Sequence, residues 1–214
     1  MPTVAMIAVL AVASFANGAM SWAWLFTWLC NGKDIRLVGS GNPGASNVYR
    51  ECGLPMGLLT MVMDIQKGVT TLLLAAWLLP EFGRLEFSIV QLALGLAAWL
   101  GHVYSPLLGF RGGKGVATLI GIYAVVFPLG LVTAILAGLA IMAVYRWFSL
   151  GSLIGVTTFP VSYFLLLEQP FMKANFPLLL FIALALVLTW MRHWGNVRRI
   201  LQGAELRIQG HNQN

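Results

Sequence analysis

Charged side chains are scarce in this sequence. They make up 9% of its 214 residues, whereas 59% are hydrophobic and the mean hydropathy is +0.83. An ordinary soluble domain carries roughly 25% charged residues. A chain with so little charge cannot form a polar outer surface of that kind, so the composition predicts an integral membrane protein.

Acidic residues and cysteines are also few. Seven Asp and Glu residues stand beside 13 Lys and Arg residues, which gives a net charge of +6. Because there is no basic arm or polar domain to hold a duplex, nucleic acid is excluded as a partner, and contacts with anionic lipid headgroups or anionic substrates are expected instead. Cys30 and Cys52 belong to no C-x-x-C or Cys/His pattern. We therefore expect no metal site, and no cofactor.

Apolar stretches long enough to cross a bilayer follow one another along the chain. The first covers about residues 4–29, and because no Lys or Arg precedes Lys33, an uncleaved anchor is favoured over a signal peptide. The stretch 116–145 is too long for one span and contains Phe127-Pro128, so we predict a break there. The remaining stretches cover about residues 54–79, 87–108, 150–167 and 176–191.

About seven helices also agree with the distribution of positive charge. With the N-terminus outside, seven crossings leave nearly all Lys and Arg residues, including those of the tail, in the cytoplasm, as the positive-inside rule requires. The piece from Val116 to Phe127 is short for a full crossing, so we expect it to be tilted or buried. The predicted fold is an all-α, polytopic membrane protein with cytoplasmic glycine-rich loops, and residues 1–214 form one domain.

A basic, glycine-rich loop runs from Gly109 to Thr118 between two apolar stretches. Glycine frees its backbone to bring N–H groups up to an anion, and the cations supply positive charge. The residues concerned are Arg111, Gly112, Gly113, Lys114 and Gly115. A nucleotide P-loop is excluded, because it would need Gly at position 108 and a hydroxyl at position 115. A phosphate cradle and a plain turn marked by inside-facing cations explain this loop equally well.

The first polar loop contains a literal G-x-G-x-x-G from Gly39 to Gly44. It follows a membrane helix and no strand, so it is not a dinucleotide fingerprint. The loop still offers neutral donors on a flexible backbone, bracketed by two guanidinium groups suited to phosphate. These residues are Arg36, Gly39, Ser40, Gly41, Asn42, Ser46, Asn47 and Arg50. For Ser46 and Asn47, capping of the next helix is an equally good interpretation.

Ionisable residues also occur inside the second apolar stretch, where they are costly. Asp64 and Lys67 lie three residues apart, on one face of a helix. They form either a polar wall of a site within the membrane or a pair that neutralises itself while Lys67 anchors a neighbouring loop. We favour the pair.

Three different polar motifs follow one another along the chain. The first runs from Asp34 to Gly53, the second joins Gly101-His102 to residues 110–118, and the third runs from Arg192 to Glu205. Shorter matches are Asp64-x-x-Lys67-Gly68 and Arg146-x-x-Ser149-x-x-Ser152. Together these motifs resemble those of the bacterial acyl-phosphate:glycerol-3-phosphate acyltransferases over nearly the whole chain. The departures, such as Arg111 in place of Lys and Ser46 in place of Thr, are mild.

This resemblance implies a seven-helix acyltransferase of the bacterial inner membrane, with its N-terminus outside and its C-terminus in the cytoplasm. It would transfer a fatty acyl group from acyl phosphate to the sn-1 hydroxyl of glycerol 3-phosphate, giving lysophosphatidic acid and phosphate in the first acylation of phospholipid synthesis. Its partners would be these substrates and membrane lipids, with functional coupling to the enzyme that forms acyl phosphate and to the next acyltransferase.

The resemblance also implies roles for individual residues. The glycines of the second loop and Lys114 would bind glycerol 3-phosphate, while Ser40 and Arg50 would hold the acyl phosphate. The general base is left open between His193 and a substrate phosphate oxygen. Candidate catalytic residues are Ser40, Arg50, Lys114, Ser152, His193 and Asn196. Candidate substrate-binding residues are Arg36, Gly39, Gly41, Asn42, Asn47, Arg111, Gly112, Gly113, Gly115, Arg146 and Ser149. His102 and Glu205 are expected to be structural, Glu205 by ion pairing in the tail.

Two alternatives remain at this point. A carrier for an organic phosphate could also use basic glycine loops, but the cations gather on one predicted face and no inverted repeat is found. An acyltransferase with a thioester donor usually carries a His-x-x-x-x-Asp motif, which this sequence lacks.

Overall fold

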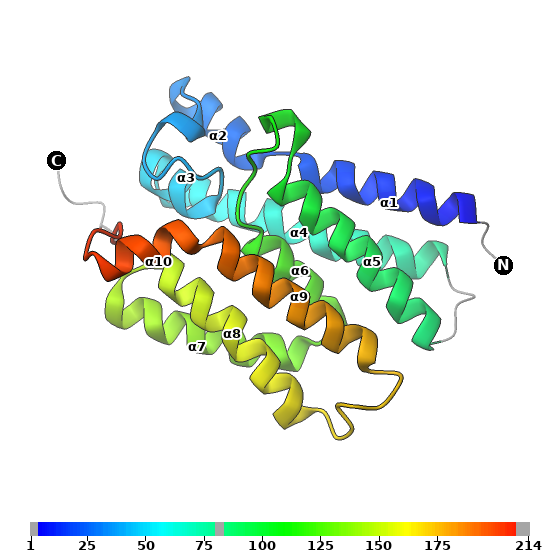
Figure 1. Ribbon diagram of the computed structural model, residues 1–214. Helices are drawn as coiled ribbons and strands as arrows, with labels where there is room; N and C mark the ends of the chain where they lie inside the picture. The colour runs from blue at the N-terminus through cyan, green and yellow to red at the C-terminus, as the bar shows by residue number, and fades with distance from the viewer. Residues whose placement is uncertain (1–3, 80–83, 209–214) are drawn as a thin grey trace.

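Ten α-helices form the computed structural model over the residues that it describes, 4–79 and 84–208 (Figure 1). Their bounds are α1 Val4–Ala19, α2 Trp22–Asn31, α3 Ala45–Cys52, α4 Leu54–Leu78, α5 Arg84–Val103, α6 Val116–Val126, α7 Pro128–Tyr145, α8 Phe148–Leu166, α9 Phe176–Arg192 and α10 Trp194–Leu201. Two short 3₁₀ helices, η1 (Ile35–Leu37) and η2 (Pro106–Leu108), lie in the polar loops. The prediction of an all-α protein is confirmed.

The long helices pack side by side, and the most extensive contacts join α7 to α8, α1 to α5 and α4 to α6. The start of α1 and the end of α10 lie at opposite ends of this bundle (Figure 1). By length and apolar composition, four segments of the described chain can cross a membrane: Val4–Asn31, Leu54–Leu78, Pro128–Tyr145 and Phe148–Leu166. A fifth is added if α9 and α10, which meet at a bend of 55°, count as one.

The predicted break at Phe127-Pro128 is present. Helix α6 ends at Val126, Phe127 has the non-helical angles φ −154° and ψ 70°, and Pro128 occupies the first turn of α7. Proline has no N–H to donate and its ring would clash with the preceding turn, so the chain starts a new helix there. Helix α6 is therefore a short apolar helix of 11 residues.

A second break was not predicted. We expected one helix over residues 4–29, but α1 ends at Ala19 and α2 begins at Trp22. Ser21 caps the new helix, because its side chain accepts a hydrogen bond from the Trp24 amide. The break also frees backbone carbonyls inside the bundle, and the Ala19 carbonyl accepts a 2.6 Å hydrogen bond from Ser105 Oγ. The interruption is thus stabilised by a polar group from the loop that follows α5.

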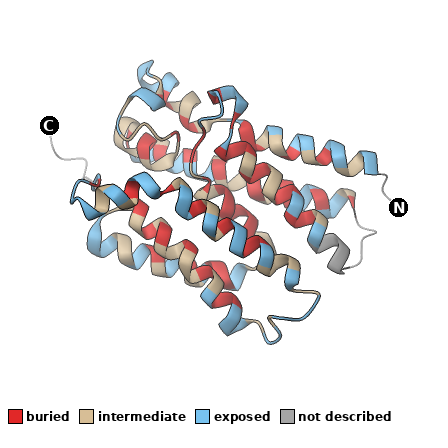
Figure 2. Cartoon of the chain, in the orientation of Figure 1, coloured by how far each residue is buried: buried red, intermediate tan, exposed pale blue. Residues whose placement is uncertain are grey.

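The core is centred on α6. Its Tyr123 ring stacks on Phe159 of α8 with centroids 3.6 Å apart, and Phe127 meets Phe159 edge to face. Both Tyr123 and Phe159 are buried. In Figure 2, buried residues follow the inner faces of the helices, while exposed residues follow the outer faces. Many of the exposed residues are large and apolar, as expected for a surface in contact with lipid.

Two glycines allow α4 and α6 to touch through their backbones. A Cβ on Gly121 of α6 would lie 2.0 Å from the Ile65 carbonyl oxygen, and one on Gly68 of α4 would lie 2.4 Å from the Thr118 carbonyl oxygen. Small residues permit such close approach between membrane helices. This contact fixes the depth at which the N-terminus of α6 sits.

We therefore expect Gly121→Ala to destabilise the protein, by roughly 1–3 kcal/mol from overpacking, and to lower its Tm in detergent. The matched control is Gly95→Ala in α5, where a Cβ would meet Leu72 and Ile122 at ordinary distances of 3.4 and 3.5 Å. The control should be neutral or stabilising, because alanine favours a helix more than glycine does. Equal Tm values for the two variants would contradict the contact.

Candidate active site

A cavity of about 560 Å³ lies where the two polar loops and the C-terminal segment meet. All six predicted catalytic residues line it: Ser40, Arg50, Lys114, Ser152, His193 and Asn196. Three predicted substrate-binding residues do so as well: Asn42, Gly115 and Ser149. One wall is apolar and is formed by Leu54, Leu58, Met61, Ile120, Leu139 and Met142. The cavity thus combines a polar, cationic part with an apolar part.

Asn47 shapes the first loop from beneath. Its side chain is fully buried, and its amide nitrogen donates to the carbonyls of Ile35 and Val38 at 3.2 and 3.0 Å. Its side-chain oxygen accepts a 2.9 Å hydrogen bond from the Ser40 amide. These contacts use both ends of the Asn47 amide and bring Ser40 to the cavity. Asn47 is therefore structural, but the expected capping is wrong, because Gly44 is the N-cap of α3 and no side chain caps this helix.

The second loop differs from the expectation in one respect. We expected the Gly112 and Gly113 amides to face an anion, but they donate to the carbonyls of Val103 and His102, over 3.1 and 3.2 Å. The last turn of a helix leaves carbonyls without intrahelical donors, and these two amides satisfy two of them at the end of α5. The expectation is wrong for these amides. A Cβ on Gly112 would lie 2.0 Å from the His102 carbonyl oxygen, so glycine is needed for this close approach.

The residues that are arranged to bind an anion begin with Lys114, directly after Gly113. Lys114, Gly115 and Val116 line the cavity at the N-terminus of α6, where the first amides of a helix lack intrahelical acceptors. Gly115 has φ +79°, and a Cβ there would lie 2.0 Å from Trp99 Nε1. The Trp99 indole donates to the Gly115 carbonyl at 3.1 Å. The start of α6 is therefore held rigidly against α5.

Lys114 points across the cavity to the third motif. Its ammonium group donates to Asn196 Oδ1. Burial is the main cause that lowers the pKa of Lys114 to about 8, and the nearby charge of Glu205 opposes this shift. Lys114 therefore remains mostly protonated at neutral pH.

Glu205 is the centre of the polar network. Its Oε1 accepts hydrogen bonds from Ser149 Oγ at 2.7 Å and from Asn196 Nδ2 at 2.6 Å, and its Oε2 accepts from Arg199 Nε at 2.9 Å. Although burial acts to raise the pKa of this carboxyl, these hydrogen bonds and the Arg199 charge hold it below its ordinary value. The predicted ion pair in the tail is confirmed, and the same carboxylate also orients Asn196 toward Lys114.

Arg50 forms the opposite side of the polar part. Its guanidinium donates to the carbonyls of Ser46 and Leu206, at 3.2 and 3.3 Å, and lies over the Phe148 ring. Its Nε–H is buried and has no hydrogen-bond partner within the described chain. Burial lowers the pKa of Arg50 below its ordinary value, but the group stays charged. Arg50 thus contributes a positive charge to the cavity wall.

His193 lies in the break between α9 and α10. Its Nδ1 is 2.9 Å from the Thr189 carbonyl oxygen, which can only accept, so Nδ1 carries the proton and Nε2 has a free lone pair. Burial and the charge of Lys114 lower the pKa of His193 to about 4. The imidazole is therefore neutral at physiological pH.

Other predicted residues lie around the cavity rather than in its wall. Arg36 pairs with Asp34 and donates to the Leu108 carbonyl at 3.0 Å, which ties the two polar loops together. Arg146 is exposed, has φ +58° at the end of α7 and donates to the Ile208 carbonyl. Those that do not line the described cavity are Arg36, Gly39, Gly41, Asn47, Arg111, Gly112, Gly113 and Arg146. Their predicted contacts with substrate remain predictions.

Two features of the site escaped the sequence reasoning. The Arg192 guanidinium donates to the carbonyls of Gly112 and Gly113, at 3.1 and 3.4 Å, and so clamps the second loop to α9. The apolar wall was missed because nearly every helix is apolar all round, and no periodicity distinguishes a cavity face from a lipid face. For Arg192, its place in the third motif was the one available signal.

Comparison with known proteins gives a consistent result. A protein-family model described as glycerol-3-phosphate acyltransferase matches residues 8–203. A glycerol-3-phosphate acyltransferase of Leptospira borgpetersenii is 36% identical over 203 residues, covering 93% of this chain and 90% of that protein. One of Geobacter sulfurreducens is 38% identical over 180 residues, covering 84% and 86%.

Two crystal structures are similar over most of the chain. Both are of PlsY, an integral membrane glycerol 3-phosphate acyltransferase. Its glycerol 3-phosphate form has a TM-score of 0.85 at 32% identity, and its lysophosphatidic acid form has a TM-score of 0.81 at 30% identity. Each comparison covers 95% of this chain and 96% of the other.

The Glu205 network predicts a specific pH dependence of stability. Because the pKa of Glu205 is lower in the folded protein than its ordinary value of 4.5, its ionised form stabilises the fold above that pH and loses this effect as the pH falls. We expect Glu205→Gln to lower the Tm at pH 7 by several degrees, and the difference from the parent to shrink toward pH 3.

The matched control is Glu168→Gln, which changes an exposed carboxylate in the loop between α8 and α9. Its Tm should equal that of the parent at every pH. If Glu205→Gln behaved in the same way, the carboxylate would not hold this network together.

Proposed function

Because this chain belongs to the glycerol-3-phosphate acyltransferase family, we propose that it transfers a fatty acyl group from acyl phosphate to the sn-1 hydroxyl of glycerol 3-phosphate. The products are lysophosphatidic acid and phosphate. The chain is an integral membrane enzyme, so the carrier alternative is set aside. The observation that carries the proposal is that one cavity combines a cationic part for phosphate with an apolar wall for an acyl chain.

The phosphate of glycerol 3-phosphate binds at Lys114 and the N-terminus of α6. A phosphate there gains the ammonium charge and the free amides of the first helical turn, which is the usual geometry of a helix anion site. Lys114 is already aimed across the cavity by Asn196, which Glu205 holds in turn. The site is therefore preorganised rather than formed on binding.

The acyl phosphate binds on the other side, between the first loop and α8. Its phosphate is held by Arg50 and Ser40, and its chain lies along the apolar wall. Support comes from the charge of Arg50 and from Ser152, since both residues line this region of the cavity. A greasy substrate enters such a cavity from the membrane and a soluble one from the water.

Direct transfer accounts for the chemistry. The acceptor oxygen attacks the acyl carbonyl carbon and forms a new C–O bond, the bond from that carbon to the phosphate oxygen breaks, and phosphate leaves with the electron pair. The hydroxyl proton passes to a substrate phosphate oxygen. A phosphate monoester has a second pKa of about 6, whereas the pKa of His193 is about 4, so the phosphate is the stronger base.

We place this site at the cytoplasmic face. The cations of the two polar loops and the tail meet at one end of the bundle, since Arg36 contacts Leu108, Arg50 contacts Leu206 and Lys114 contacts Asn196. Lys173 lies in the loop between α8 and α9, at the end where α1 begins (Figure 1). The positive-inside rule then supports an N-terminus outside and one domain of seven membrane helices in the bacterial inner membrane. Enzymes that form acyl phosphate and that acylate the product act before and after it.

The proposal is tested with purified protein in lipid, using labelled glycerol 3-phosphate with palmitoyl phosphate or palmitoyl-CoA in parallel. We expect labelled lysophosphatidic acid from the acyl phosphate and none from the thioester, because the sequence lacks the His-x-x-x-x-Asp motif that assists a poorer leaving group. Product from palmitoyl-CoA alone would overturn the donor while leaving the acceptor unchanged.

Lys114 gives the reaction a defined alkaline limit. If its ammonium form binds the phosphate and its pKa is about 8, kcat/KM for glycerol 3-phosphate should be level near neutral pH. It should fall by up to about tenfold per pH unit above pH 8.

Lys114→Arg is the comparison, since a guanidinium stays charged throughout this range. Its profile should remain level to higher pH, whatever its absolute rate. Identical profiles for the parent and Lys114→Arg would assign the alkaline fall to another group.

A further inference from the structure

A second polar cluster lies inside the bundle, and two of its members, Asp64 and His102, also line the cavity of about 560 Å³. Lys67 Nζ is 2.7 Å from Asp64 Oδ1 and 3.3 Å from His102 Nδ1, and it also donates to the Met20 carbonyl at the break between α1 and α2. The side chains of Lys67 and Asp64 are only 1% and 3% exposed. The predicted Asp64–Lys67 pair is thus confirmed, and it has a third member that the sequence did not indicate, His102.

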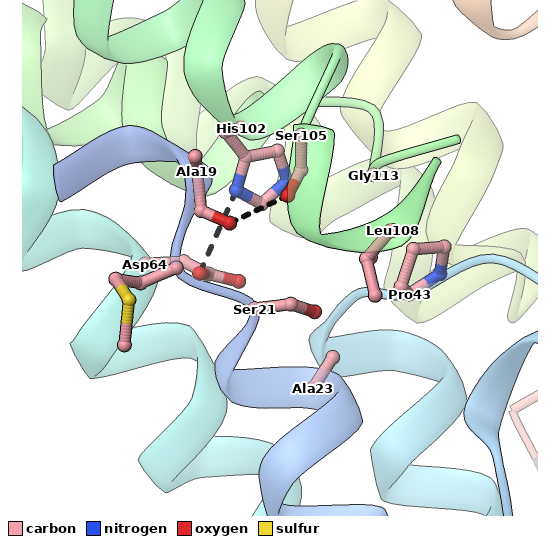
Figure 3. A pocket seen from close by; sticks show the side chains of 10 residues that line it. Ala19, Ser21, Ala23, Pro43, Asp64, His102, Ser105, Leu108 and Gly113 are labelled. Atoms are coloured by element: carbon pink, nitrogen blue, oxygen red, sulfur yellow. Dashed lines mark hydrogen bonds and ion pairs between the residues drawn. The ribbon is translucent and has the colours of Figure 1, made fainter. Parts of the chain in front are cut away.

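The contacts fix the tautomer of His102. An ammonium group has donors only, so His102 Nδ1 must accept from Lys67, and the proton of a neutral ring is then on Nε2. Asp64 Oδ1 lies 3.6 Å from the same Nδ1, which is too far for a hydrogen bond but within ion-pair distance, so Asp64 contacts both Lys67 and the ring (Figure 3). The Lys67 ammonium thus has two hydrogen-bond acceptors, Met20 O and His102 Nδ1, and a counter-ion in Asp64, as a buried charge requires.

The protonated side of the ring faces the loops of the active site. A Cβ on Gly113 would lie 2.3 Å from His102 Nε2 and 2.8 Å from the Pro43 carbonyl oxygen, so the ring, the second loop and the first loop meet there. Figure 3 shows His102 beside Gly113, with Asp64 on its other side, around a small cavity of about 10 Å³. The His102 carbonyl also accepts the Gly113 amide. The next residue is Lys114.

The free-energy cost of burying these charges indicates that the cluster has a function. Burying an ion pair in the membrane gains little over apolar residues of the same size, because the loss of hydration offsets the attraction. Apolar packing would therefore stabilise the helices as well. What it would not supply is a fixed hydrogen-bond acceptor for Lys67 and a fixed direction for the imidazole.

We propose that Asp64 and Lys67 are positioning residues for catalysis. They hold His102 in one tautomer and one orientation against Gly113, and so set the place of Lys114 and the N-terminus of α6 relative to the first loop. This inference rests on the proposed function, in which Lys114 binds glycerol 3-phosphate. Because α4 carries the pair and also contacts α6 through Gly68, one helix locates both sides of the phosphate site.

The test is Asp64→Asn, assayed with each substrate varied in turn. Asparagine keeps the shape but removes the charge that holds Lys67. Since small misplacements of binding groups are costly, we expect the KM for glycerol 3-phosphate to rise about tenfold and the KM for acyl phosphate to stay within about twofold. A merely structural role would reduce the amount of folded enzyme, and hence the maximal rate, and leave both KM values unchanged.

The control is Thr60→Val, one turn earlier on α4. Thr60 is also fully buried, its Oγ1 bonds to the Met56 carbonyl of its own helix, and it does not line the cavity. Both KM values should match the parent. A rise in the KM for glycerol 3-phosphate in Thr60→Val as large as in Asp64→Asn would overturn the proposal.

His102 provides a second test that does not depend on Asp64→Asn folding. Glutamine keeps an N–H near the Nε2 position, whereas asparagine keeps one only near Nδ1. His102→Gln should hold the KM for glycerol 3-phosphate within about threefold of the parent, and His102→Asn should raise it about tenfold. Equal effects of the two variants would contradict the assigned tautomer and with it the proposal.

Lys114→Ala separates this inference from the proposed function. If Lys114→Ala raises the KM for glycerol 3-phosphate while Asp64→Asn does not, the positioning role fails and the phosphate site stands. If Lys114→Ala leaves that KM unchanged, the phosphate site fails and the positioning role fails with it.

Discussion

The carboxylate of Glu205 is the interaction on which the polar half of the site depends. It is bonded to α8 through Ser149, to α10 through Asn196 and Arg199, and it leaves Asn196 oriented toward Lys114. The cavity concentrates cations that repel one another, and the buried Glu205 carboxylate, which accepts from three donors, offsets part of that repulsion. The C-terminal segment is therefore part of the site rather than a loose tail.

A second constraint is the membrane itself, because a polar group that is buried there without a hydrogen bond costs free energy. At two places where a helix is interrupted, the freed backbone carbonyls accept hydrogen bonds from other parts of the chain. The carbonyls freed between α1 and α2 accept from Ser105 and Lys67, and those at the end of α5 accept from the Gly112 and Gly113 amides. The loops are thus hydrogen-bonded to helix ends, which holds them in place. The amides of the first turn of α6 are not used in these contacts and remain available to a ligand.

Much of this could be read from the sequence, for physical reasons. Proline at position 128 forces a break, and an Asp and a Lys three residues apart in an apolar helix must pair. All six catalytic residues that were predicted from the motifs line one cavity, although they lie far apart in the sequence. The break at Ser21 was not predicted, because a serine cap needs no proline or glycine to mark it. The break is also stabilised by Lys67 of α4 and by Ser105 of the loop after α5, which are distant in the sequence.

The exposed cations show where sequence reasoning about charge ends. Arg36 and Arg146 were predicted to bind substrate because a guanidinium suits phosphate. In the structure both donate hydrogen bonds within the chain, Arg36 to the Leu108 carbonyl and the Asp34 carboxylate and Arg146 to the Ile208 carbonyl. Arg50 and Lys114 carry the same charge but lie in the cavity wall, and each has a pKa lowered by burial. Desolvation, which depends on tertiary packing, distinguishes the two groups. A cation therefore indicates a binding site only when the fold has removed it from water and left a donor facing a cavity.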